Sequence, residues 1–340
     1  MGFHIYKHDK RDGRKLWLYS QAERDYQFTN DMPPVDSPSK PIARHHPLRG
    51  EQVFYNPGRN TRTLNPPPDY NPLAPVPKDG FPGEIPVTDF EVAIFQNRWP
   101  GLTDPPDMAK EFGHAYGRCE VVVYDTADTG SLADRSVEEV ALLLRAIGHR
   151  YEDIMADPAI NVVLPFENRG AFVGTTLPHP HGQIYAFRDL SPMMERQAKA
   201  ASDGAFSEID RTNAVASDAL TSTFCPSFGR YPYETWIMPE RSVTSPSEMS
   251  EAELTSFAVH LRDQVARFDQ LFSTPMPYVM WHALPPRGSE AVWPYHIQFW
   301  PLQRGEGKMK YLASVEQITG SYLVDVMPED AAQTLAAMKI

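Results

Sequence analysis

The chain has 340 residues, of which 41% are hydrophobic, and its formal net charge at pH 7 is −12. A chain of this length and composition can bury one large core or two fused smaller ones. The negative charge argues against an extended nucleic-acid or anionic-membrane surface, so an anionic ligand would need a local group of Arg or Lys. The two cysteines, Cys119 and Cys225, are too few for a disulfide framework or a cysteine-based metal site, which fits a reducing cytoplasm.

The sequence shows none of the segments that anchor or export a protein. No apolar run is long enough to span a bilayer, and the polar N-terminus has no signal-peptide core. We therefore expect a cytoplasmic protein that has neither a membrane nor a nucleic acid as its partner.

Proline dominates the first third of the chain, where most of the 33 prolines lie before residue 110. Such stretches predict extended loops that wrap a core, because proline is excluded from helix interiors and central strands. Residues 1–40 are expected to form an N-terminal extension with a short strand at 15–19. Further strands are predicted at 90–97, 119–125, 161–166 and 182–187.

A helix followed by a strand occurs twice. Ser136 and Glu139 form a capping box at the start of an apolar stripe, and residues 250–275 repeat this pattern. The strand-like run 176–187 is matched by 292–302, and each run carries a His-x-Gln sequence. Two such copies predict a duplicated α+β unit whose halves pack through one continuous sheet.

The run LPHPHGQIYAF, residues 177–187, carries the clearest functional signal. In an extended segment His179 and His181 point to the same face, and Gln183 continues it. The flanking prolines lack N–H donors and confine the run to an edge or a strand–loop junction. A rigid run with three polar side chains on one face is a poor way to fill a core, so it predicts a functional site.

The longer segment FENRGAFVGTTLPHPHGQIYA, residues 166–186, resembles the active-site segment of the galactose-1-phosphate uridylyltransferase family, part of the histidine-triad superfamily. The similarity extends over about residues 42–318. It includes an arginine-bearing region at 45–75, a strand at 85–102 that resembles the wall of the family's nucleotide pocket, and second-half strands within 278–302.

This resemblance implies a fold of duplicated histidine-triad-like half-barrels, which form one continuous, mainly antiparallel sheet with flanking helices. After the N-terminal extension at 1–40, the first half would span 41–190 and contain the HPHGQ motif. The second, degenerate half would span 191–340.

The resemblance also implies ping-pong nucleotidyl transfer, in which a histidine attacks the α-phosphate of a nucleotide sugar and a sugar phosphate is exchanged. The nucleophile would be His181, with Gln183 as its supporting donor and His179 as an orienting residue. Neutral imidazole is a good nucleophile, and an amide can donate to phosphoryl oxygens as their charge redistributes. The implied nucleotide- and phosphate-binding residues are Arg59, Arg62, Asn97, Asn168, Arg169, Gly174, Thr175 and Thr176.

The sequence departs from the family at the structural zinc. The usual ligands are two cysteines in C-x-x-C, a later histidine and the first histidine of HPH. Asn71 and Ala74 stand at the cysteine positions and Asp128 stands at the third, which leaves only His179. We therefore expect no structural zinc, because one imidazole with an Asn and an Asp does not make a closed tetrahedral site.

A second metal site occurs in some members of the family, where a glutamate and three histidines bind the ion. His282 and His296 match, Gln298 replaces the third histidine, and the glutamate position falls near Glu195 or Gln197. This set could hold Mg²⁺ or Mn²⁺ weakly. In the alternative interpretation, the two histidines are buried, hydrogen-bonded strand residues.

The sequence also departs from the family at residues implied to bind the sugar. Ser227 stands where the family usually has a large aromatic residue, and a glutamine expected within 318–324 is replaced. These departures predict a changed sugar or base specificity. The implied sugar-binding residues are Ser227, Lys308, Lys310, Tyr311 and Glu316.

Three functions are compatible with these features. The first is a nucleotidyltransferase that acts on a UDP- or GDP-hexose through His181, and we expect it to be a homodimer. The second is a nucleotide-sugar pyranose–furanose mutase on the same scaffold, of the kind found in antibiotic biosynthesis, that uses Mg²⁺ or Mn²⁺. The third is a catalytically silent nucleotide-binding protein, which the intact HPHGQ motif disfavours.

Overall fold

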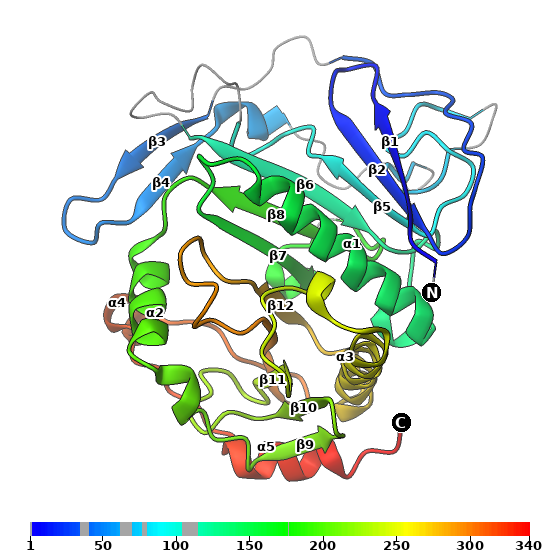
Figure 1. Cartoon of the computed structure of the whole chain (residues 1–340). Coiled ribbons are helices and arrows are strands. Elements are labelled where there is room, and N and C mark those ends of the chain that lie inside the picture. The colour runs from blue at the N-terminus through cyan, green and yellow to red at the C-terminus, as the bar shows by residue number, and fades with distance from the viewer. Residues whose placement is uncertain (1, 35–40, 62–69, 77–79, 104–114, 176) are drawn as a thin grey trace.

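The computed structural model describes residues 2–34, 41–61, 70–76, 80–103, 115–175 and 177–340. Within this part of the chain eleven strands form one antiparallel sheet, in the order β1-β2-β5-β6-β8-β7-β12-β13-β11-β10-β9 (Figure 1). Its strands are β1 (His4–Asp9), β2 (Lys15–Ser20), β5 (Val92–Gln96), β6 (Gly117–Val123), β7 (Val162–Arg169), β8 (His181–Phe187), β9 (Ala214–Ser217), β10 (Thr221–Phe224), β11 (Thr235–Pro239), β12 (Tyr278–Ala283) and β13 (His296–Pro301). Two small two-stranded sheets pair β3 (Ile42–His45) with β4 (Gln52–Tyr55) and β14 (Gln303–Gly305) with β15 (Lys308–Met309).

Two long helices, α1 (Val137–Met155) and α3 (Glu251–Leu271), cover one face of the sheet (Figure 1). Each begins with the predicted capping box, in which Ser136 or Ser250 accepts from a backbone N–H three residues later. None of the described helices has the length and apolar character needed to cross a bilayer. The shorter helices are α2 (Pro192–Ser202), α4 (Ser314–Thr319) and α5 (Pro328–Ala336), and the 3₁₀ turns are η1 (Pro57–Thr61), η2 (Leu132–Asp134), η3 (Ala171–Val173), η4 (Ala205–Glu208) and η5 (Pro246–Glu248).

The predicted fold class is confirmed, because two strand–helix–strand units share one continuous sheet. They meet at the central pair of β7 and β12. Paired residues of an antiparallel ladder share a face, so Gln183, Phe166, Trp281 and Gln298 form one row across the sheet. Both His-x-Gln sequences therefore present their side chains on the same face, which is the face opposite α1 and α3.

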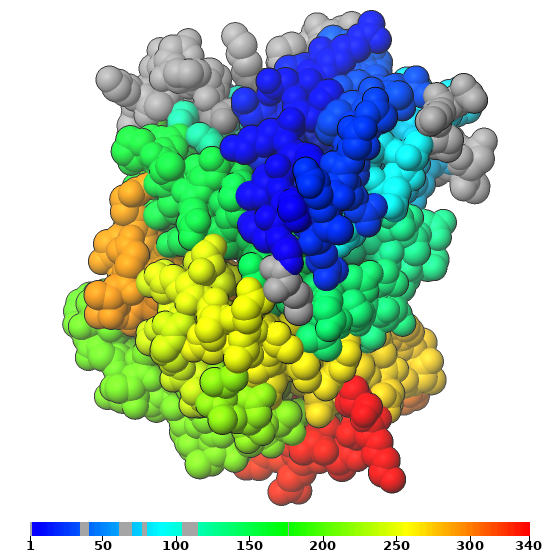
Figure 2. All heavy atoms as spheres, turned by 45° about the vertical axis from the view of Figure 1, so that its right-hand side comes forward, coloured from blue at the N-terminus to red at the C-terminus, as the bar shows by residue number. Residues whose placement is uncertain are grey.

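Different segments cover that second face in the two halves. In the first half, loop residues such as Leu73 and Ile85 pack against Phe95 of β5. In the second half, Met194 of α2 packs with Trp281 of β12. Figure 2 shows the early part of the chain, in blue and cyan, at one end of the molecule and its last part, in red, at the other. Each half can therefore form its own cavity on this face.

The segment predicted as an N-terminal extension is part of the sheet. β1 and β2 form a hairpin, and β2 pairs with β5. From this hairpin Lys10 donates to the backbone and side-chain oxygens of Glu84 over 2.7 and 2.5 Å. Arg14 donates to the same carboxylate over 2.7 Å. The hairpin thereby fixes a loop on the second face of the sheet.

A buried ion pair joins α1 to the sheet. Arg150 donates through Nε and Nη2 to the carboxylate of Glu120 on β6, over 2.9 and 2.7 Å. Its guanidinium also lies 3.7 Å from the ring centroid of Trp17 on β2. Neither charged side chain is more than 1% exposed. Removing one partner would leave the other charge buried and unpaired.

We expect Arg150→Met to lower the free energy of unfolding by about 3–5 kcal/mol, because Glu120 would remain buried without its cation. Denaturant unfolding followed by circular dichroism measures this change. The double variant Glu120→Leu/Arg150→Met should recover much of the loss. The control Lys199→Met removes an exposed pair with Asp203 and should change little. Equal unfolding midpoints for Arg150→Met and the parent would contradict the stabilising role of this ion pair.

Candidate active site

His181 is the first residue of β8, and its ring is oriented by the backbone. Nδ1 lies 2.8 Å from the carbonyl oxygen of His179, and because a carbonyl only accepts, Nδ1 carries the proton. Nε2 is then the unprotonated nitrogen, and it has no hydrogen-bond partner among the described residues. Burial lowers the pKa of His181, which favours the neutral ring. A neutral imidazole with an open Nε2 is the nucleophilic form.

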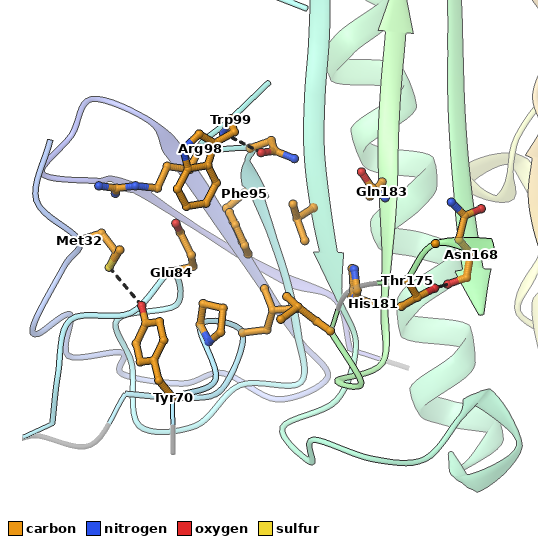
Figure 3. A pocket seen from close by; sticks show the side chains of 16 residues that line it. Met32, Tyr70, Glu84, Phe95, Arg98, Trp99, Asn168, Thr175, His181 and Gln183 are labelled. Carbon is orange, nitrogen blue, oxygen red and sulfur yellow. Dashed lines mark hydrogen bonds between the residues drawn. The ribbon is translucent and has the colours of Figure 1, made fainter. Parts of the chain in front are cut away.

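His181 lines a cavity of about 350 Å³ on the second face of the sheet (Figure 3). The cavity is built from the first half of the chain, by β5, β6, β7, β8 and the loops around residues 70 and 84. The predicted residues that line it are His181, Gln183, Asn97, Asn168, Gly174 and Thr175. An imidazole and neutral amide side chains thus meet in one place.

A tight turn after β7 positions the donor loop. Gly170 and Gly174 have φ values of 94° and 78°, in the left-handed region that suits glycine. The Thr175 hydroxyl donates to the Asn168 carbonyl oxygen over 2.8 Å and closes the turn. The turn therefore fixes Asn168 and Thr175 in the wall of the cavity that His181 also lines.

His179 is buried and both of its ring nitrogens are occupied. Nδ1 lies 2.8 Å from the Asn71 amide nitrogen, and Nε2 lies 2.7 Å from the Asp125 carbonyl oxygen. Asn71 and His179 therefore meet at the family's zinc position, joined by a hydrogen bond. Asp128 is exposed. In the part of the chain that the structure describes, no group of three or more His, Cys, Asp or Glu is arranged to hold a metal ion.

We expect the melting temperature to be unchanged by chelation, because hydrogen bonds hold His179 where the family uses zinc. Differential scanning calorimetry before and after EDTA treatment, with elemental analysis, tests this. The variant Asn71→Ala should lose about 1–3 kcal/mol of stability, since it leaves a buried ring nitrogen unsatisfied. One zinc per chain, with unfolding on its removal, would contradict the prediction.

Two of the predicted phosphate-binding arginines do not line this cavity. Arg169 pairs with Asp269 of α3 over 2.6 Å, and it lines a neighbouring depression that His181 also borders. Arg59 lies at the margin, where Nη1 donates to the Trp99 carbonyl and the Tyr185 hydroxyl over 3.3 and 3.4 Å. The other two predicted residues, Arg62 and Thr176, lie outside the described residues.

The predicted sugar-binding set does not reach His181 within one chain. Lys310 is buried and donates to Glu316 over 2.7 Å and to the backbone of Leu323. The other members of this set, Ser227, Lys308 and Tyr311, are exposed. All five belong to the second half, whereas the lining of the cavity comes from the first.

The predicted metal ligands also fail to converge. His282 pairs with Ile297 across the ladder and His296 pairs with Ala283, which places the two rings on opposite faces. Burial lowers the pKa of His282 to about 3 and that of His296 to about 4. Glu195 lines a separate surface depression. The structure matches the alternative of buried, hydrogen-bonded strand histidines.

His296 lines a second cavity, of about 440 Å³, in the second half. Its Nδ1 lies 2.9 Å from the Pro294 carbonyl, as in His181, but Gln298 donates to Nε2 over 2.9 Å. Trp236 stacks on the ring with centroids 4.8 Å apart. The Nε2 of His296 is therefore engaged by Gln298, whereas the Nε2 of His181 has no partner among the described residues.

Sequence reasoning missed the end of the first cavity that lies away from His181. Figure 3 shows Tyr70, Glu84, Arg98 and Trp99 there. Glu84 stands in a proline-rich loop and carries no periodic signal. Among the described residues, the partners of its side chain come from the N-terminal hairpin.

Comparisons with known proteins agree with this geometry. The chain matches the model of the galactose-1-phosphate uridyl transferase N-terminal domain over residues 40–191, and that of the C-terminal domain over 185–340. A galactose-1-phosphate uridylyltransferase of Thermotoga maritima is 31% identical over 319 residues, which cover 87% of this chain and 98% of that protein. One of Streptomyces lividans is 30% identical over 292 residues, or 81% of this chain and 79% of that protein. A solved uridylyltransferase structure superposes with a TM-score of 0.75 at 24% identity and covers 87% of this chain and 98% of its own.

Proposed function

Because the chain belongs to the galactose-1-phosphate uridylyltransferase family, we propose that it transfers a nucleotidyl group between sugar phosphates through a covalent adduct on His181. The observation that carries this proposal is the open Nε2 of a neutral, backbone-oriented imidazole at the cavity. The substrate would be an NDP-hexose, and the relatives named above are uridylyltransferases.

In the first step, the Nε2 lone pair attacks the α-phosphorus of the nucleotide sugar. A P–N bond forms, and the P–O bond to the sugar phosphate breaks with its electron pair, so the sugar phosphate leaves. The ring becomes cationic, and its Nδ1–H continues to donate to the His179 carbonyl, which stabilises that charge. A second sugar phosphate attacks the adduct in reverse, and the imidazole returns to its starting form.

The donors around the cavity match the charge that redistributes onto the phosphoryl oxygens. The Gln183 amide lies on the same face as His181, two residues further along β8, and Asn168 lies on the neighbouring strand. Both amides have no hydrogen-bond partner among the described residues. Donors fixed in advance at a developing oxyanion lower the barrier without reorganisation.

We expect His181→Ala to abolish turnover while leaving nucleotide affinity within a few fold, because the nucleophile contributes mainly to the chemical step. Intact-mass spectrometry after incubation with UDP- or GDP-hexose should show an acid-labile nucleotide increment in the parent and none in the variant. The matched control is His296→Ala, because its Nε2 is blocked, and it should still form the adduct. Ring-isomerised product from the nucleotide sugar alone, without any adduct, would instead support a mutase.

We expect adduct formation to persist at acidic pH. An unperturbed histidine loses nucleophilicity below about pH 6.5, where it protonates. Burial lowers the pKa of His181, so the acid limb of the single-turnover rate should lie below that value. Quenched-flow mass spectrometry between pH 4.5 and 8 measures this profile. An acid limb at or above pH 6.5 would contradict the assigned protonation state.

A further inference from the structure

One buried carboxylate lies across the cavity from the nucleophile. Figure 3 shows Glu84 on the side away from His181, with Phe95 between them, and with Trp99 and Arg98 beside it. If the α-phosphate lies against His181, a nucleotide that extends through the apolar middle of the cavity brings its base to this carboxylate.

Glu84 is held so that only one oxygen is engaged. Its side chain is 7% exposed, and Oε2 accepts from Lys10 and Arg14 over 2.5 and 2.7 Å. Oε1 has no hydrogen-bond partner among the described residues. Because two cations fix the first oxygen, the second is a rigid acceptor at the end of the cavity.

We propose that Glu84 selects the base of the nucleotide and that this site prefers guanine to uracil, an inference that rests on the proposed nucleotide-sugar function. The Watson–Crick edge of guanine presents two adjacent donors, the N1–H and the exocyclic N2 amino group, and both suit a carboxylate. Uracil presents one N–H between two carbonyl oxygens, whose lone pairs face the carboxylate unfavourably. A site built to receive donors discriminates strongly against a ligand that lacks them.

Lys10 and Arg14 also determine how the side-chain amide would be oriented in Glu84→Gln. In Glu84→Gln, Lys10 and Arg14 need an acceptor, so the amide oxygen takes the place of Oε2. The amide nitrogen then faces the cavity, and the acceptor becomes a donor. This reversal disfavours guanine and favours a base with a carbonyl at the same place. Xanthine is such a base, because it carries an oxygen where guanine carries the N2 amino group.

Isothermal titration calorimetry with GDP, XDP, UDP and ADP tests the proposal, and because these ligands carry no sugar the result is independent of transfer. The parent should bind GDP at least about tenfold more tightly than the other three, the effect of one charge-assisted hydrogen bond. Glu84→Gln should lose about tenfold or more for GDP and gain affinity for XDP. The matched control is Glu91→Gln, which alters a carboxylate paired with Arg24 outside the cavity and should keep the preference of the parent.

Each other outcome has a definite meaning. UDP binding more tightly than GDP in the parent would overturn the base assignment and leave nucleotidyl transfer intact. An equal loss for all four ligands in Glu84→Gln, with no gain for XDP, would assign the carboxylate to ribose hydroxyls and overturn the proposal. Absence of binding by every nucleoside diphosphate would overturn both this inference and the proposed function.

Discussion

The antiparallel pairing of β7 with β12 is the constraint on which the rest of the structure depends. It joins two similar units into one sheet, and its register sets which side chains share a face. On the helical side, Tyr124 and Tyr278 donate to the buried carboxylate of Glu167, each over 3.0 Å, so the two halves share one polar contact. Burial raises the pKa of Glu167, and each of its two oxygens accepts from one of these hydroxyls. The pairing is thus held by a ladder and by side chains from both halves.

Each half places a histidine ring with the same backbone contact on one face of the sheet, but the side chains around the two rings differ. In each copy a ring Nδ1 contacts the carbonyl oxygen two residues earlier, at His179 or Pro294. In the second copy Gln298 donates to Nε2, and its amide oxygen accepts from two indole N–H groups. In the first copy the glutamine has no described partner, and the ring lines a cavity. The difference between an open and a blocked imidazole therefore lies in what surrounds Nε2, since the backbone contact is the same.

The repeated helices and the central strands could be predicted because their signals are local. Ser136 and Ser250 cap helices within three residues, and the His-x-Gln spacing defines one face of a strand whatever its neighbours are. Positions that depend on pairing between distant segments could not be predicted. His282 and His296 match a ligand pattern in sequence, yet the register of β12 and β13 places them on opposite faces. The described partners of the Glu84 carboxylate lie in a hairpin more than sixty residues earlier in the chain.

Charge explains why neutral donors dominate the described part of the site. The chain is acidic overall, and the guanidinium of Arg169 is already paired with Asp269. Beside His181 the side-chain amides of Gln183 and Asn168 line the cavity without a hydrogen-bond partner among the described residues, so they can act through fixed dipoles. A transferase that passes one group between two sugar phosphates must release each of them, and uniformly strong cationic binding of ground states would slow that release without lowering the chemical barrier. Fixed dipoles directed at phosphoryl oxygens would favour the transition state instead, and neutral amides beside a neutral imidazole meet that requirement.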